Sequence, residues 1–240
     1  MNKFAIFVEG QTEQIFVERL VLCLGGDTNV GLSAERMTGG RRRQPRHVIE
    51  ISGASDPESH DFFVLIVDCG QDGRVKSDIH DRYDGLIAAS YKHIVGIRDV
   101  HPHLRDDIQT IREGFEFRLP SEPFKPSLIL EIMDAEAWFL AEHSHFPRIH
   151  TSLTIERIHQ QFGFHPANDD MQLRDRPSKD LEDIYFLETI NYHKTRQHVE
   201  RTVNSLDFSI VQNEVANNFD DLGNLVTLLR QFFATDESAS

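Results

Sequence analysis

The sequence predicts an α/β protein with a mostly parallel sheet, followed by a helical C-terminal subdomain. In the first half, short apolar runs typical of buried strands alternate with segments of helical periodicity. In the second half, amphipathic helical segments follow one another and strand-like runs are scarce. The order strand, helix, strand favours parallel pairing, because each crossover helix returns the chain to the same end of the sheet.

Five apolar runs in the first 133 residues are predicted as strands. The run at 62–67 is continuously apolar, which is typical of a strand buried on both faces. The predicted strands cover residues 4–8, 47–51, 62–67, 93–97 and 128–133. The predicted helices of this half cover residues 12–24, 78–90, 104–115 and 134–142. No strand is predicted in the polar, glycine-rich stretch between the first helix and residue 46.

The second half is predicted to be helical, with amphipathic segments at 154–161, 178–189 and 215–233. We therefore expect an α/β domain over residues 1–150 and a helical subdomain over 151–235 packed on it. The last five residues, 236–240, are expected to form a frayed tail.

Composition limits the class of protein. The 240 residues carry 25 basic and 39 acidic side chains, a net charge of −14, so any contact with nucleic acid must be local. No window approaches 18 consecutive apolar residues, and the N-terminus reaches Glu9 before a signal-peptide core forms. The lack of such a window predicts no membrane partner. The two cysteines, Cys23 and Cys69, lie in apolar runs, which favours free thiols in a reducing cytoplasm.

Acidic residues follow three successive predicted strands: Glu9, Asp68 and Asp99. Glu131 lies within the fourth predicted strand of this series, and Glu136 follows it. The carboxyl ends of parallel strands share one edge, where ligands of open α/β sheets bind. Gathered carboxylates repel one another, and a hard divalent cation such as Mg²⁺ or Mn²⁺ relieves that repulsion. The alternative is that these acids only cap the helices that follow.

The first of these motifs resembles a known family. The segment Phe-Ala-Ile-Phe-Val-Glu-Gly-Gln-Thr-Glu at 4–13 is similar to the first motif of Toprim domains, in the form found in OLD-family nucleases and in small Toprim-like proteins of the DUF4276 type. The blocks at 66–74, 94–102 and 131–142 resemble the smaller family in the same order. The segments 177–181 and 192–194 resemble its helical tail, so the similarity covers most of the chain.

The resemblance implies a Rossmann-like Toprim fold, with Glu9 as metal ligand or general acid/base and Glu13 as a second acid. The family's Asp-x-Asp at the third strand reads Asp99-Val100-His101 here, so only the first acid matches. Asp68 with Asp72 is a possible substitute at a different spacing. The expected catalytic residues are Glu9 and Asp99. The expected metal ligands are Glu9, Glu13, Asp68, Asp72, Asp99 and Glu136.

The implied chemistry is phosphoryl transfer supported by Mg²⁺ or Mn²⁺. We therefore expect a metal-dependent nuclease or phosphodiesterase acting on nucleic acid, and the family analogy implies a place in bacterial defence. The alternative is a noncatalytic Toprim-like module that binds nucleic acid or a nucleotide, or that recruits a partner protein. The departure at His101 and the acidic net charge favour this alternative.

Cationic residues that can contact phosphate are few. Arg41, Arg42, Arg43 and Arg46 form the one dense basic cluster, and arginine matches phosphate geometry well. The family resemblance adds Lys179 and Lys194. The alternative is that all six are ordinary solvated side chains.

Overall fold

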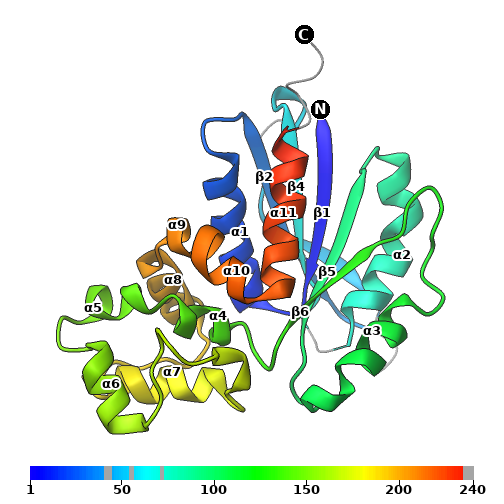
Figure 1. Cartoon of the computed structure of the whole chain (residues 1–240). Helices are drawn as coiled ribbons and strands as arrows, with labels where there is room; N and C mark the ends of the chain where they lie inside the picture. The colour runs from blue at the N-terminus through cyan, green and yellow to red at the C-terminus, as the bar shows by residue number, and fades with distance from the viewer. Residues whose placement is uncertain (41–44, 54–56, 71–72, 235–240) are drawn as a thin grey trace. The chain divides into compact units, whose positions relative to one another are not determined.

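The protein is an α/β protein built on a six-stranded, mostly parallel sheet, as the sequence predicts (Figure 1). A computed structural model describes residues 1–40, 45–53, 57–70 and 73–234. The strand order is β3-β2-β4-β1-β5-β6. The strands are β1 (Asn2–Val8), β2 (Val30–Thr38), β3 (His47–Ser52), β4 (Phe62–Asp68), β5 (His93–Asp99) and β6 (Ser127–Glu131).

The central strand β1 pairs in parallel with both β4 and β5. Val8 lies opposite Asp68 on one side and opposite Ile97 on the other. The carboxyl ends of these three strands therefore lie at one edge of the sheet, as the order of elements predicts. β2 extends the parallel arrangement by pairing with β4, whereas β3 pairs with β2 in the antiparallel direction.

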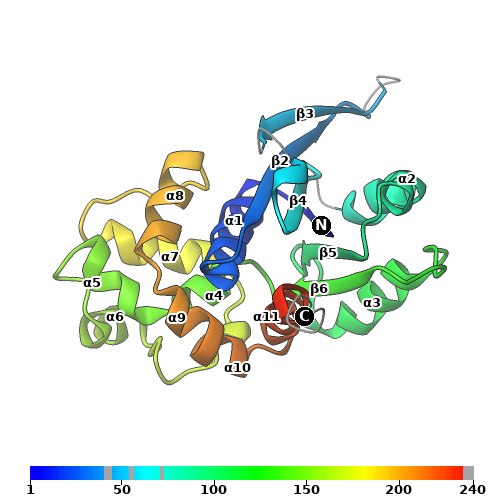
Figure 2. The same cartoon turned by 90° about the horizontal axis from the view of Figure 1, so that it is seen from above.

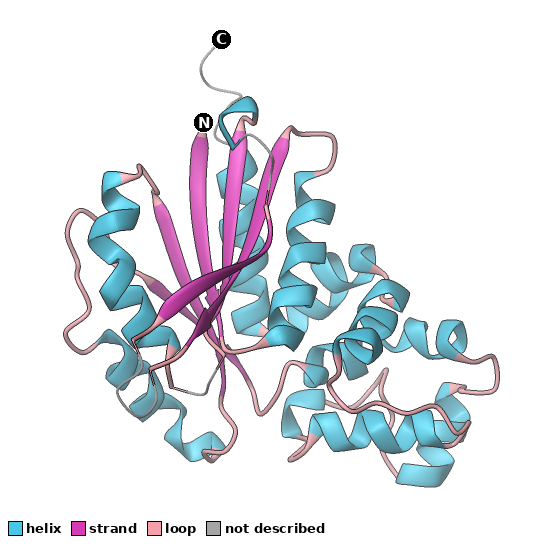
Figure 3. Ribbon diagram, turned by 180° about the vertical axis from the view of Figure 1, so that it is seen from behind, coloured by secondary structure: helices cyan, strands magenta, loops and turns pink. Residues whose placement is uncertain are grey.

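Helices cover both faces of the sheet (Figures 2 and 3). On one face Phe4 and Phe62 contact Phe232 of α11 (Asp220–Ala234), with ring centroids 5.3 Å apart in each pair. Figure 2 shows α1 (Gln11–Gly25) on this same face. Alternate strand residues such as Ala5 and Phe7 face the opposite layer, formed by α2 (Val75–Ala88) and α3 (Ile108–Glu116). The strict alternation along buried strands thus builds two apolar cores.

Gly96 of β5 allows α2 and α3 to approach the sheet closely. A Cβ atom at this position would lie 2.8 Å from Val75 Cγ1 and 2.9 Å from Phe115 Cε2. Both distances are shorter than real carbon contacts, so the second apolar layer requires glycine at this point of the strand.

By its internal contacts the chain divides into two compact units. The sheet unit comprises Met1–Arg98, Ile108–Leu130 and Leu225–Ser240. The helical unit comprises Asp99–Asp107 and Glu131–Asn224. The division crosses β5 and β6 one residue before each strand ends.

The helical unit consists of short helices. They are α4 (Glu136–Ala141), α5 (Phe146–Ile149), α6 (Ile155–Phe162), α7 (Pro177–Phe186), α8 (Arg196–Ser205), α9 (Phe208–Ile210) and α10 (Ala216–Asn218). The predicted segments at 154–161 and 178–189 correspond to α6 and α7. The third, at 215–233, is divided between α10 and α11 by an extended residue, Phe219.

Strand β2 is the main element that the sequence did not predict. Its sequence is Val-Gly-Leu-Ser-Ala-Glu-Arg-Met-Thr, in which apolar and polar residues alternate only weakly. The segment is a strand in the structure because it pairs in parallel with β4. The predicted tail at 236–240 lies outside the described residues. Both cysteines are free thiols. Among the helices that the structure describes, none combines the length and apolar character needed to cross a lipid bilayer.

Candidate metal centre

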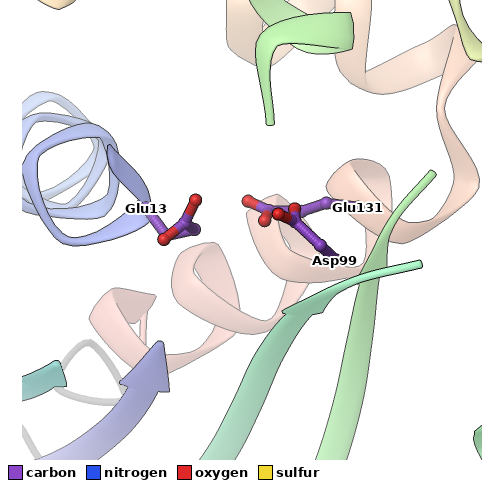
Figure 4. Close-up of side chains that lie close together, drawn as sticks. All are labelled: Glu13, Asp99 and Glu131. Atoms are coloured by element: carbon purple, nitrogen blue, oxygen red, sulfur yellow. The ribbon is translucent and has the colours of Figure 1, made fainter. Parts of the chain in front are cut away.

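Three carboxylates gather at the carboxyl edge of the sheet: those of Glu13, Asp99 and Glu131 (Figure 4). One ligand atom from each lies within 4.8 Å of the other two. Figure 4 shows the three side chains directed toward one another. Glu13 and Glu131 are buried and Asp99 is partly buried, so the group is withdrawn from bulk water.

Each acid is placed by the end of a regular element. Asp99 and Glu131 are the last residues of β5 and β6. Beyond them the two segments stay joined, because Val100 N donates to Glu131 O at 2.9 Å and His101 N donates to Met133 O at 3.1 Å. The two strand ends are therefore held together by backbone hydrogen bonds.

Glu13 belongs to the first turn of α1, which begins after the tight β1–α1 connection. The positive end of the helix dipole favours a carboxylate at this position. Gly10 precedes the helix, and a Cβ atom there would lie 3.2 Å from Glu13 Oε2. A glycine at this connection thus leaves room for the Glu13 carboxylate.

The donor set fits a hard divalent cation. All three donors are carboxylate oxygens, which Mg²⁺ and Mn²⁺ prefer. Two ligands on opposite sides of Mg²⁺ are about 4.2 Å apart, so a spread of up to 4.8 Å needs a contraction of a few tenths of an ångström. Glu13, Asp99 and Glu131 are the residues that would hold the ion.

Two other acids of the expected metal set lie elsewhere at this edge. Asp68 follows the register to the end of β4, but its carboxylate accepts from Arg36 Nε at 2.6 Å and from Gly70 N at 2.8 Å. Glu9 is buried directly after β1. Neither joins the three-carboxylate group of the described residues. Asp72 lies outside the part of the chain that the structure describes.

Glu136, also expected as a metal ligand, is engaged by a lysine and a tyrosine. Lys194 Nζ lies 3.0 Å from Glu136 Oε2, and Tyr192 Oη donates to Glu136 Oε1 at 2.6 Å. The same ammonium lies 3.4 Å from Asp134 Oδ1, while Ser178 Oγ donates to Asp134 Oδ2 at 3.0 Å. We call this set, Asp134, Glu136, Lys194, Tyr192 and Ser178, the lysine cage.

Burial and pairing oppose one another in the lysine cage. Complete burial raises the pKa of Glu136, and the Lys194 charge partly offsets this rise. For Lys194, desolvation lowers the pKa, but the nearby Glu136, Asp134 and Asp99 carboxylates outweigh it and raise the pKa above its ordinary value. Lys194 is therefore a permanent cation at neutral pH.

The expected phosphate contacts are engaged within the protein wherever they are described. Arg46 forms a bidentate ion pair with Asp78, and its Nη2 donates to Cys69 O at 3.0 Å. Lys179 lies 3.0 Å from Glu182 and 2.8 Å from Asp183, on its own helix α7. Arg41, Arg42 and Arg43 lie outside the described residues.

Glu131 was recognised in the sequence as an acid of the fourth predicted strand, but it was not among the expected metal ligands. The sequence placed it inside a strand at 128–133, whereas β6 ends at Glu131 itself. That difference of two residues moves Glu131 from a strand interior to the strand end. His101, at the position of the family's second aspartate, is exposed and lies outside the carboxylate group of the described residues.

Comparison of the chain with protein-family models, with curated proteins and with solved structures found no match.

Proposed function

We propose that this protein is a Toprim-like, Mg²⁺- or Mn²⁺-dependent phosphodiester hydrolase that acts on nucleic acid. The observation that carries the proposal is the convergence of Glu13, Asp99 and Glu131 within 4.8 Å at the carboxyl edge of the sheet. Two of these acids, Glu13 and Asp99, are named by the resemblance of the sequence to Toprim motifs. The sheet edge is also where open α/β folds bind their ligands.

In this proposal the chain's own residues divide the work. Glu13, Asp99 and Glu131 hold the cation, which when bound supplies Lewis-acid stabilisation of charge on the phosphoryl oxygens. Glu9, buried at the start of the β1–α1 connection, is our candidate for the group that orients or deprotonates the attacking water. A reducing cytoplasm belongs to the same proposal because both cysteines lie in apolar runs, and a role in bacterial defence belongs to it through the family resemblance alone.

The test begins with metal binding, since a ligand that binds only the folded protein raises its stability. At a Mn²⁺ concentration 100 times the dissociation constant, the gain is about 2.7 kcal/mol. We expect Mn²⁺ to raise the melting temperature of the parent and not of the Asp99→Asn or Glu131→Gln variants. Asp27→Asn, at an exposed acid in the loop after α1, is the matched control and should keep the gain.

Cleavage is then measured on single- and double-stranded DNA and on RNA with Mn²⁺ present. Removing one electrostatic contributor to a transition state costs about 100-fold or more in rate. We expect losses of at least that size for Glu9→Gln, Glu13→Gln, Asp99→Asn and Glu131→Gln, with binding of the substrate retained. Equal cleavage by the parent and by all four variants would refute the proposed site.

Nucleic-acid binding is tested through its salt dependence. Each phosphate contact on duplex DNA contributes about −0.9 to the slope of log K against log salt. Replacing Arg41, Arg42 and Arg43 by glutamine should therefore flatten the slope by roughly 2 to 3. Arg46 is left unchanged because its ion pair with Asp78 is part of the fold.

The noncatalytic alternative predicts a different result from the same experiments. The departure at His101 from the family's second aspartate favours it. A binding module would lose affinity in the triple arginine variant, and the parent would cleave no substrate with any divalent metal. If metal stabilises the protein but no substrate is cleaved, the result favours a metal-binding, noncatalytic module over a hydrolase.

A further inference from the structure

The lysine cage is built as a cation site whose cation is an amino group. Asp134 and Glu136 are 7% and 0% exposed, and each has one oxygen facing Lys194 Nζ. The other oxygen of each accepts a hydroxyl hydrogen bond, from Ser178 and Tyr192 respectively. The two carboxylates are thus oriented by neighbouring hydroxyl groups and present their remaining oxygens to one positive charge.

Lys194 reaches this position through a strained backbone. Its φ angle is 47°, in the left-handed region that a residue with a Cβ atom adopts at a cost. Met133, which directly precedes Asp134, also has a positive φ of 71°. Two left-handed residues therefore stand at the two sides of the cage, one beside a carboxylate and the other at the ammonium itself.

The cage adjoins the candidate metal centre along the chain. Asp134 is three residues after Glu131, and the segment between them is tied to the end of β5 by the hydrogen bond from His101 N to Met133 O. Asp99, a member of the carboxylate group, acts electrostatically on Lys194. Enzymes that transfer phosphoryl groups with two metals place two positive charges side by side at such a centre.

We propose that Lys194 takes the place of a second divalent cation, so that Asp134 and Glu136 hold an ammonium ion and not a metal. The inference rests on the proposed function, because it assigns the second positive charge of that same site. In this arrangement the protein binds a divalent cation only at Glu13, Asp99 and Glu131. Glu136, expected from the sequence to be a metal ligand, then serves to position Lys194.

The experiment counts Mn²⁺ ions bound per chain, by calorimetric titration and by electron paramagnetic resonance of free Mn²⁺. The quantity that tests the inference is the difference between the parent and Lys194→Gln. Without the ammonium, Asp134 and Glu136 become two unneutralised carboxylates, and we expect one additional, weaker Mn²⁺ per chain. Lys194→Arg keeps the charge and is the matched control, with no additional ion.

The double variant Lys194→Gln/Glu136→Gln removes one carboxylate and should lose the additional Mn²⁺ again. A purely structural ion pair predicts the same stoichiometry in the parent and in all three variants, which would overturn the inference. Failure of the proposed function is a separate result: the parent would then bind no Mn²⁺, while the increment in Lys194→Gln would still be measurable.

If Lys194→Gln is less stable than the parent, the inference can still be tested by thermal unfolding. If Mn²⁺ takes the place of the ammonium, millimolar Mn²⁺ should raise the melting temperature of Lys194→Gln by more than it raises that of the parent. The double variant should show no such excess. An equal effect of Mn²⁺ on Lys194→Gln and on the double variant would contradict the assignment of Lys194.

Discussion

Two buried aspartates of the sheet unit and Glu142 of the helical unit have different kinds of hydrogen-bond partner. In the sheet unit, buried aspartates are paired with arginines: Asp68 with Arg36, and Asp78 with Arg46. In the helical unit, Glu136 is paired with Lys194, but Glu142 accepts from the uncharged groups Ser144 Oγ and Asp207 N. Guanidinium groups keep their charge at every accessible pH, whereas hydroxyl and amide donors carry none.

The difference extends to the buried histidine of the helical unit. His145 is fully buried, with Nδ1 2.6 Å from Glu142 O and Nε2 2.9 Å from Tyr185 Oη. Burial raises the pKa of Glu142, and the same effect lowers the pKa of His145 to about 4. Acid acts on these two groups in opposite directions: the lowered pKa of His145 favours unfolding as the pH falls, whereas the raised pKa of Glu142 favours the folded state. We therefore compare packing in the sheet unit with the contribution of His145 to the acid response of the helical unit. The four predictions below test this contrast.

The largest effect is expected from Phe232→Ala in the sheet unit. Phe232 is 1% exposed, and its ring contacts those of Phe4, Phe62 and His93. Truncating a buried aromatic residue costs about 3 to 5 kcal/mol, because the cavity that it leaves closes only in part. Urea unfolding followed by circular dichroism measures the loss, and Phe232→Leu should recover much of it. A cost below about 1 kcal/mol would show that the apolar layer does not govern this unit.

Acid is expected to act on the helical unit through His145. Its pKa is about 4 in the folded protein and about 6.5 in the unfolded chain, so the unfolded chain binds the proton first. Stability is therefore lost as the pH falls from about 6.5 to about 4, by up to about 3 kcal/mol from this group. Besides burial, the charges of Arg148 and His143 oppose protonation.

The measurement compares urea unfolding of the parent and of His145→Gln at pH 7 and at pH 4.5. Trp138, the single tryptophan, is buried in the helical unit, so its fluorescence reports on that unit. The variant should lose less stability than the parent between the two pH values, whatever its stability at pH 7. Identical losses would place the acid-sensitive group elsewhere.

The burial of each strand explains which strands the sequence could predict. Strands β1, β4 and β5 were predicted because their apolar runs are continuous, which reflects burial between two helical layers. β2 was not, since only Gly31, Ala34 and Met37 are buried along it. Its place depends on the register with β4, which is a property of the folded sheet.

The candidate site shows the same limit. Glu13 and Asp99 were named from motif and strand order, and the structure brings them together with Glu131. The cross-strand pair of Asp68 with Arg36 joins residues 32 positions apart, and no local sequence pattern predicts it. The pairing of Glu136 with Lys194 spans 58 residues between two segments of the helical unit. Such pairs between distant residues engage Asp68 and Glu136, two acids that the sequence predicted as metal ligands.

Gly96→Ala is expected to cost less than the loss of Phe232. The new Cβ atom would lie 2.8 Å from Val75 Cγ1 and 2.9 Å from Phe115, so the α2 and α3 layer must shift. Overpacking of this kind costs about 1 to 3 kcal/mol. The same change at Gly85, where a Cβ atom would meet nothing within 4 Å, is the control and should be neutral or stabilising. Equal changes in the free energy of unfolding at the two positions would mean that α2 and α3 move away from the sheet without loss of stability.

The smallest effect is expected at the start of α6 in the helical unit. Thr154 caps this helix, and its Oγ1 accepts from Arg157 N at 3.3 Å. In the sheet unit, by contrast, α1 begins after Gly10 with no side-chain cap. Thr154→Ala should destabilise the helical unit by about 1 kcal/mol, since a backbone donor loses its partner, and Thr154→Ser should restore most of this. The Trp138 fluorescence transition in urea measures both variants at pH 7. If Thr154→Ala and Thr154→Ser unfold at the same urea concentration as the parent, the hydrogen bond at the start of α6 contributes little to the stability of the helical unit.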